Sequence, residues 1–264
     1  MEHQKIAGTG EEKAGGKAGA FSLLRHLPQE WRERRTLALV DDIVRQMGHD
    51  PEAARVRLDA LGKNLADDPI ARAGWSMSVC AWVERWVSQD PITARRLVDD
   101  LADHAGRNPS EDALKAHWGV AAFHFIAGRA AFDPEGCRAL LASLQPHLLG
   151  APPPVTLRRL WAMAAQRWIV AVAALDGRAA LGGLGAVASL ALLIADEIPT
   201  DLSIVSLWLQ TMTGLIAPDS LGHELLRAAV MPQAQALEAA YARHGTIAAA
   251  LAGLQHVLKE DFAE

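Results

Sequence analysis

The clearest pattern in this 264-residue chain is a set of segments that each open with an aspartate and continue with helical hydrophobic spacing. Three begin with Asp-Pro and a fourth with Asp-Gly; the aspartates are Asp50, Asp90, Asp133 and Asp176. Aspartate is a favoured helix N-cap and proline suits the first helical position, so each pair predicts a helix start. Apolar residues follow each aspartate at offsets of 4, 8 and 11 residues. These offsets lie on one stripe and predict an amphipathic helix with one buried face.

A tryptophan marks a second helix in each segment. The four tryptophans are Trp75, Trp118, Trp161 and Trp208, and the first three each stand 15 residues before the next aspartate. Large apolar residues follow each tryptophan at offsets of 7 and 8, and Trp82 and Trp168 are two of them. A residue that recurs at one offset in every unit is typical of the core between helices. The sequence therefore predicts helical hairpins that repeat about every 43 residues, with these tryptophans in the core.

The repeat defines the expected domain organisation. We expect a flexible N-terminal tail (1–20) and one all-helical repeat domain (21–264). The domain is expected to comprise an N-terminal cap (21–49), four units (50–89, 90–132, 133–175 and 176–218) and a C-terminal cap (219–264). In the C-terminal cap we expect a helix start at Asp219, a break at Pro232, and two closing helices separated near Gly245.

The expected fold class is all-α, in the form of a right-handed α-solenoid-like stack of helical hairpins. A period of about 40 to 47 residues with two helices per unit resembles HEAT-type arrays more than tetratricopeptide arrays of roughly 34 residues. A compact multi-helix bundle built by duplication is the alternative. Composition excludes an all-β protein, because 50 Ala and 35 Leu outnumber 15 Val and 11 Ile, and only 14 residues are aromatic.

Charge and cysteine content limit the cellular compartment and the classes of binding partner that we expect for this chain. A net charge of −5 and an isoelectric point near 6.1 argue against nucleic-acid binding, which needs a basic face. Cys80 and Cys137 lack metal-type spacing, and residues 1–20 lack a secretory signal pattern, so we expect a reduced, cytoplasmic chain. The uncharged run 179–195 is shorter than the roughly 20 residues of a spanning helix, which argues against integral membrane insertion.

One motif resembles a catalytic site. The segment 99–103, with sequence DDLAD, resembles the aspartate-rich motif of class I isoprenoid synthases, which are also all-helical. The resemblance implies that Asp99, Asp100 and Asp103 hold magnesium ions that bind a diphosphate. A class I isoprenoid-synthase-like enzyme is therefore an alternative function.

Two observations disfavour that enzyme. The second metal motif of the family is incomplete here, because Asp196 begins it but Ile204 stands where a glutamate is required. In addition, Leu97 and Leu101 lie on the predicted buried stripe, which places Asp99 and its neighbour Asp103 on the solvated face.

An arginine column is the best candidate for a binding site. Arg55, Arg95 and Arg138 stand five residues after their aspartates, and Leu181 breaks the series in the fourth unit. This offset borders the buried stripe, so a stacked array could align the three side chains along one surface. The column could bind carboxylates of a partner, since arginine matches their geometry. Alternatively, each arginine pairs with an aspartate of a neighbouring unit or caps a helix.

By analogy with other helical-repeat proteins, the sequence predicts a non-catalytic scaffold or adaptor that binds a partner peptide or helix on an extended surface. A HEAT-like DNA-binding or repair module is a further alternative. We expect no catalytic residue, no metal site and no cofactor, since the ten histidines lack ligand-type spacing. Neither the identity of the partner nor the oligomeric state follows from the sequence.

Overall fold

The computed structural model describes residues 28–63, 65, 68–148, 155–175, 202–215 and 223–260. These residues form ten α-helices and one short 3-10 helix, and they contain no strand. The α-helices are α2 (Gln29–Met47), α3 (Pro51–Lys63), α4 (Pro69–Trp86), α5 (Pro91–Arg107), α6 (Asp112–Arg129), α7 (Pro134–Leu144), α8 (Val155–Ala174), α10 (Leu202–Leu215), α11 (His223–Tyr241) and α12 (Gly245–Glu260). The 3-10 helix η1 (Gln145–Leu148) follows α7 directly. The predicted all-α class is confirmed.

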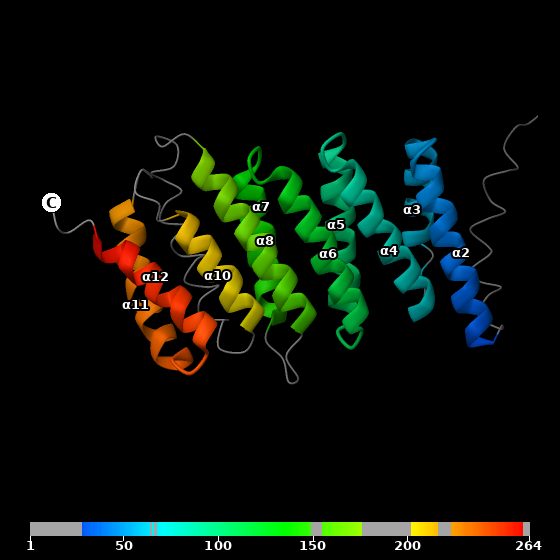
Figure 1. The fold of residues 1–264 in the computed structure, drawn as a ribbon. Coiled ribbons are helices and arrows are strands. Elements are labelled where there is room, and N and C mark those ends of the chain that lie inside the picture. The colour runs from blue at the N-terminus through cyan, green and yellow to red at the C-terminus, as the bar shows by residue number, and fades with distance from the viewer. Residues whose placement is uncertain are drawn as a thin grey trace, which may run out of the picture.

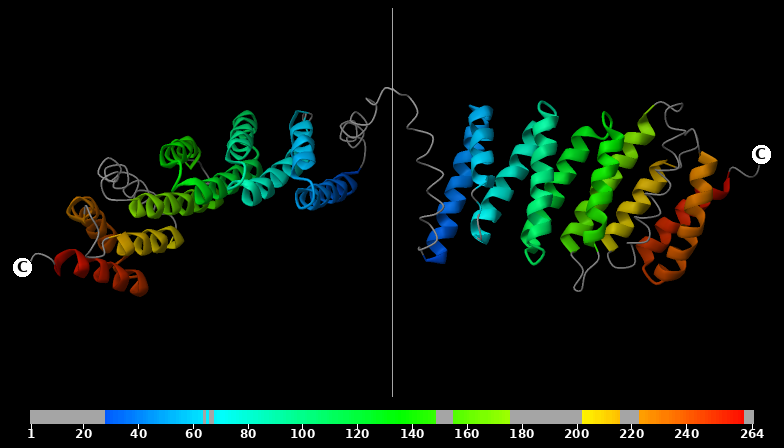
Figure 2. Two further views of the ribbon diagram at one scale, coloured as in Figure 1. Left: turned by 90° about the horizontal axis from the view of Figure 1, so that it is seen from above. Right: turned by 180° about the vertical axis from the view of Figure 1, so that it is seen from behind.

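The helices form two layers (Figure 1; Figure 2, left). In the first, which we call the tryptophan layer, α2, α4, α6, α8 and α10 each pack against the next, and α12 packs against α10. On one side of this layer lie α3, α5 and α7, and each of them contacts two helices of the tryptophan layer. The described residues form no substantial α3–α5 or α5–α7 packing. Consequently, α4 and α6 hold α3, α5 and α7 apart.

The predicted helix starts at the first three aspartates are confirmed. Each carboxylate accepts a hydrogen bond from the backbone N–H three residues further on: from Ala53 to Asp50 (3.0 Å), from Thr93 to Asp90 (3.1 Å), and from Gly136 to Asp133 (3.0 Å). Asp68 caps α4 in the same way through Ile70 and Ala71, although the sequence analysis did not single it out. Asp176 lies outside the described residues. N-capping by a carboxylate satisfies backbone donors that the first helical turn leaves unpaired.

The repeated tryptophans lie in the core, as predicted. No more than 2% of the surface is exposed for any of Trp75, Trp118, Trp161, Trp208, Trp82 and Trp168. The Nε1–H of Trp75 donates to the carbonyl of Leu58 (3.2 Å), and that of Trp161 donates to the carbonyl of Leu141 (3.0 Å). Leu58 and Leu141 have the same offset from the aspartates of their units. The first and third hairpins are therefore closed by the same contact.

A second contact recurs between neighbouring units. Trp75 packs edge-on against His104 of the next unit, with 4.9 Å between ring centroids. Trp118 meets His147 in the same way, at 5.1 Å. The two histidines share one offset from Asp90 and Asp133, so the Trp75–His104 and Trp118–His147 contacts use equivalent positions of the sequence pattern.

The predicted break at Pro232 is wrong. Helix α11 continues through this residue, and Val230, Ala234 and Leu237 on either side of it are buried. Proline removes one intrahelical hydrogen bond, but burial of this apolar stripe offsets the loss. The separation near Gly245 is confirmed, because α12 begins there.

Several predicted features lie outside the described residues. These are the N-terminal tail (1–20), the first helix of the fourth unit and the helix start at Asp219. Among the helices that are described, none combines the length and the apolar character that crossing a bilayer requires.

Candidate functional site

The three predicted arginines are engaged by acidic residues of their own helices. Glu52 and Asp59 pair with Arg55, Asp99 pairs with Arg95 (3.0 Å), and Glu135 pairs with Arg138 (2.9 Å). Arg95 also donates to the carbonyl of Gly136 at the start of α7 (3.0 Å) and lies over the Phe125 ring. These pairs neutralise much of the charge that the column would offer to a partner. In addition, Arg95 connects α5 to α7 through its hydrogen bond to Gly136. Whether the column binds a partner stays a prediction.

The aspartates of the DDLAD segment do not converge. Asp99 and Asp103 are exposed, whereas Asp100 is half-buried and pairs with Arg96 (2.9 Å). Leu97 and Leu101 are buried, as the periodicity predicts. In the part of the chain that the structure describes, no three metal-ligating side chains cluster. The residues of the second motif around Asp196 fall outside that part.

A hydrogen-bonded pair, the buried Ser76 and the half-buried His117, joins α4 to α6. Ser76 Oγ donates to the carbonyl of Ala73 (2.9 Å) and lies 2.7 Å from Nδ1 of His117. Nearby, the thiol of Cys80 donates to the carbonyl of His117 (3.1 Å), and burial raises the pKa of Cys80 to about 12. Ser76 is inaccessible and Cys80 stays protonated, so neither suits a nucleophile. Cys137 is likewise a free, buried thiol.

The outer surface of the tryptophan layer carries a row of apolar side chains. Two residues after the repeated tryptophans stand Met77, Val120 and Met163, one on each of α4, α6 and α8. A two-residue step turns about 200° around a helix, so these side chains point away from the buried tryptophans. Met77 is 38% exposed and Met163 41% exposed, while Val120 is half-buried. Because α6 packs between α4 and α8, the row crosses three adjacent helices.

Further small and apolar residues extend this surface. Ala127 and Val170 stand seven residues after Val120 and Met163, on the same helix faces, and both are exposed. We call Met77, Val120, Ala127, Met163 and Val170 together the methionine face. The sequence analysis missed this surface, although the 43-residue spacing of Met77, Val120 and Met163 was a signal for it.

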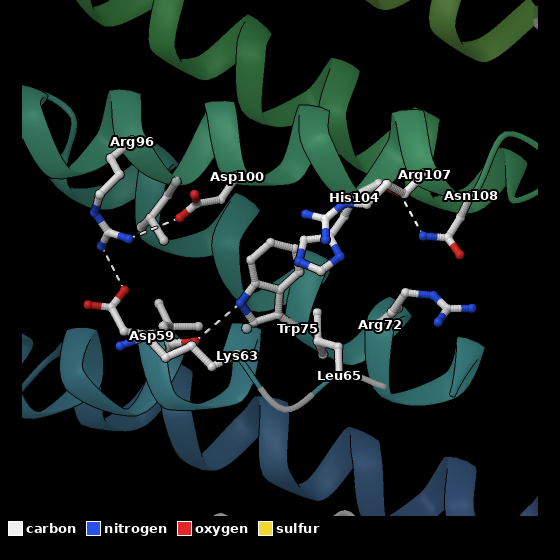
Figure 3. A pocket seen from close by; sticks show the side chains of 13 residues that line it. Asp59, Lys63, Leu65, Arg72, Trp75, Arg96, Asp100, His104, Arg107 and Asn108 are labelled. Carbon is white, nitrogen blue, oxygen red and sulfur yellow. Dashed lines mark hydrogen bonds and ion pairs between the residues drawn. The ribbon is translucent and has the colours of Figure 1, made fainter. Parts of the chain in front are cut away.

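A polar cleft lies on the other side of the tryptophan layer, between α3 and α5 (Figure 3). Its volume is about 800 Å³. The residues that line it are Leu58, Asp59, Gly62, Lys63, Leu65, Arg72, Trp75, Arg96, Leu97, Asp100, His104, Arg107 and Asn108. The cleft exists because α4 separates α3 from α5. An ideal Cβ on Gly62 would lie only 3.0 Å from Nε1 of Trp75, so glycine at this position permits the close approach of α3.

Ion pairs lie toward both ends of the cleft. At one end, Arg96 bridges Asp59 on α3 (2.6 Å) and Asp100 on α5 (2.9 Å). Toward the other end lies Arg72, whose Nε is 3.1 Å from both carboxylate oxygens of Glu111 at the start of α6. Both arginines are therefore neutralised by carboxylates of the protein.

His104 is the titratable ring in the middle of the cleft. It is half-buried against Trp75, and its backbone carbonyl accepts a hydrogen bond from Asn108 Nδ2 (2.8 Å). Burial lowers the pKa of His104, and the positive charge of Arg107 lowers it further. The imidazole is consequently neutral near pH 7, with a polar ring nitrogen rather than a full charge to offer to a ligand.

Comparison of the chain with protein-family models, with curated proteins and with solved structures gave no match, so the functional inference rests on these residues and their geometry.

Proposed function

We propose that this protein is a non-catalytic scaffold, a solenoid-like stack of helical hairpins that binds an amphipathic helix of a partner protein on the methionine face. The observation that carries the proposal is the row of apolar side chains on three adjacent helices, in which Met77 and Met163 are exposed and Val120 between them is half-buried. An apolar surface that spans several elements is typical of a protein-binding site, whereas single exposed apolar residues are not.

The chemistry of the face supports a helical partner. Methionine side chains are flexible and polarisable, and they adapt to the apolar stripe of a docked helix. Small residues such as Ala127 leave room for a helix backbone to approach. An extended peptide that adds a strand needs a sheet edge, and the described residues contain no strand.

The surroundings of the face match the usual anatomy of an interface. Arg159 and Arg167 stand four residues before and after Met163, and both are exposed. On α4, Glu84 is exposed seven residues after Met77. The apolar row is thus bordered by charges of both signs, as in interfaces with an apolar centre and a polar rim. Neither alternative, the isoprenoid-synthase-like enzyme or the DNA-binding module, has a comparable supporting observation among the described residues.

The test combines partner capture with matched surface variants. The full chain is immobilised, the captured protein is identified and purified, and its Kd is measured for the wild type and for Met77→Glu/Met163→Glu. The control is Ile92→Glu, because Ile92 is 83% exposed on α5, outside the tryptophan layer.

The proposal predicts that the double variant binds the captured partner with an affinity about tenfold lower or more. Loss of central apolar contacts costs roughly 1–2 kcal/mol or more of binding free energy. The Ile92→Glu control is expected to keep the wild-type Kd. Unchanged affinity of the double variant, or equal losses in both variants, would contradict docking on the methionine face.

A further inference from the structure

The charges beside the methionine face carry a further inference, which rests on the proposed function and specifies the chemistry of the partner. Helix α8 contains Arg158, Arg159 and Arg167 and no acidic residue, although the whole chain has a net charge of −5. Arg158 donates from Nε to the carbonyl of Leu148 (2.8 Å), so it belongs to the packing of α8 against η1. The other two arginines are the ones that border the methionine face.

Arg159 and Arg167 lie on the same side of α8 as Met163. Each stands four residues from Met163, and a four-residue step on a helix returns to within about 40° of the starting direction. All three side chains are exposed. Eight residues separate the two arginines, which corresponds to about 12 Å along the helix axis. They therefore flank Met163 on the outer surface of the tryptophan layer.

Helix α8 offers no carboxylate to neutralise this pair. In the arginine column, an acidic residue of the same helix pairs with each arginine, whereas α8 has no acidic residue at any position. Among the described residues, Arg167 forms no ion pair. The positive charge of Arg167 is therefore available to a partner at the border of the apolar row.

These arginines are not part of the repeating scaffold. At the positions that correspond to them, α4 has Ala73 and Ala81, and α6 has Ala116 and His124. A residue needed to pack one helix of the layer on the next would recur, as the tryptophans do. Arginine occurs at these positions only on α8 among the three helices, so the face has a cationic edge along α8 alone.

We propose that the partner is an acidic amphipathic helix that lies over α6, with its apolar stripe on Met77, Val120 and Met163 and carboxylates of one flank paired with Arg159 and Arg167. Two carboxylates about seven or eight residues apart, which is roughly two helical turns, match the spacing of the arginines. Arginine binds carboxylates in a bidentate geometry. A basic helix would place like charges together on this edge, which disfavours it as a partner.

The test is fluorescence anisotropy on the full chain at low salt, with two synthetic peptides of about 20 residues as probes. Both have leucines along one helical stripe; one flank of that stripe carries glutamates in the acidic peptide and lysines in the basic peptide. The charge variant is Arg159→Glu/Arg167→Glu. Its control is Arg34→Glu/Arg35→Glu, which changes the net charge equally at two exposed residues of α2, a helix that α4 separates from α6.

We expect the acidic peptide to bind the wild type about tenfold more tightly than the basic peptide, because two attractive charge pairs replace two repulsive ones. The charge variant should reverse this preference, the α2 control should keep it, and added salt should reduce it by screening. Three outcomes would overturn the acidic partner: no binding of the acidic peptide by the wild type, equal or tighter binding of the basic peptide, or an unchanged preference in the charge variant.

A neutral variant separates this inference from docking itself. Met77→Gln/Met163→Gln removes apolar contacts without changing the charge, so it should weaken the binding of both peptides by about fivefold or more. If this variant weakens both peptides while the wild type shows no preference between them, the acidic partner is contradicted and the proposed function stands. If this variant binds the acidic peptide with wild-type affinity, both the acidic partner and docking on the methionine face are contradicted.

Discussion

At the scale of single residues, ion pairs join the ends of helices in the tryptophan layer. Arg32 on α2 reaches Asp68 at the start of α4, and Arg72 on α4 reaches Glu111 at the start of α6. Burial by itself would raise the pKa of Asp68, but hydrogen bonds from Arg32 and from backbone N–H groups outweigh burial and lower it. Asp68 therefore stays ionised and serves both as a helix cap and as a partner for the neighbouring helix.

The half-buried His117 between α4 and α6 leads us to expect a loss of stability in mild acid. Burial lowers the pKa of His117 from its ordinary value of 6.5, and the same holds for His104. Below about pH 6.5 the unfolded chain binds protons that the folded chain excludes, so the free energy of unfolding falls as the pH falls. We expect Tm, measured by circular dichroism, to drop between about pH 7 and about pH 5, and His117→Gln to reduce the slope.

The matched control for that slope is the exposed His49, replaced by Gln. It should keep the wild-type dependence of Tm on pH, because the imidazole is not buried. A Tm of the wild type that is flat over this range, or a wild-type slope in His117→Gln, would show that the ring of His117 does not couple folding to pH.

At the scale of helices, two glycines of similar helical conformation have opposite surroundings. An ideal Cβ on Gly74 of α4 would lie 2.2 Å from Cγ2 of Thr36 on α2, a buried β-branched side chain that cannot easily rotate away. A Cβ on Gly106 of α5 would meet nothing within 4 Å. The α2–α4 contact therefore depends on the bare backbone of Gly74, whereas no contact depends on Gly106.

The same substitution is expected to act with opposite signs at these two positions. Gly74→Ala should lower the free energy of unfolding by about 1–3 kcal/mol, because overpacking shifts α2. Gly106→Ala should raise it by roughly 0.5 kcal/mol through helix propensity. Urea denaturation of both variants measures the difference. Equal effects of the two substitutions would mean that α2 and α4 do not pack as closely as described.

At the scale of the whole molecule, local chemistry was sufficient to predict the helices from the sequence, but it was not sufficient to predict the functional surfaces. Asp90 and Trp75 have their roles because capping and burial act within one helix or between adjacent helices, and repetition makes that signal visible. The pairing of Arg138 with Glu135 also follows a helical spacing that was present in the sequence. Pro232 shows the limit of a local rule, because burial of neighbouring side chains outweighs its tendency to break the helix.

The proposed binding surface depends on which helices become neighbours. Met77 and Arg167 are 90 residues apart in the sequence and border one face only because α6 packs against both α4 and α8. Met77 and Met163 have the spacing of the repeat, but their exposure depends on which side of the tryptophan layer the other helices cover. Helical periodicity identifies the buried face of a helix, and it does not distinguish a solvated face from a binding face.

The central claim, docking of a partner on the methionine face, is tested most directly by NMR of methyl-13C-methionine in the full chain with and without the captured partner. Met77 and Met163 are exposed on this face, whereas Met47 and Met212 are fully buried elsewhere and serve as internal references. We predict that the partner shifts or broadens the methyl signals of Met77 and Met163 and leaves those of Met47 and Met212 in place. Saturating partner that leaves the Met77 and Met163 signals unchanged would contradict the proposed function.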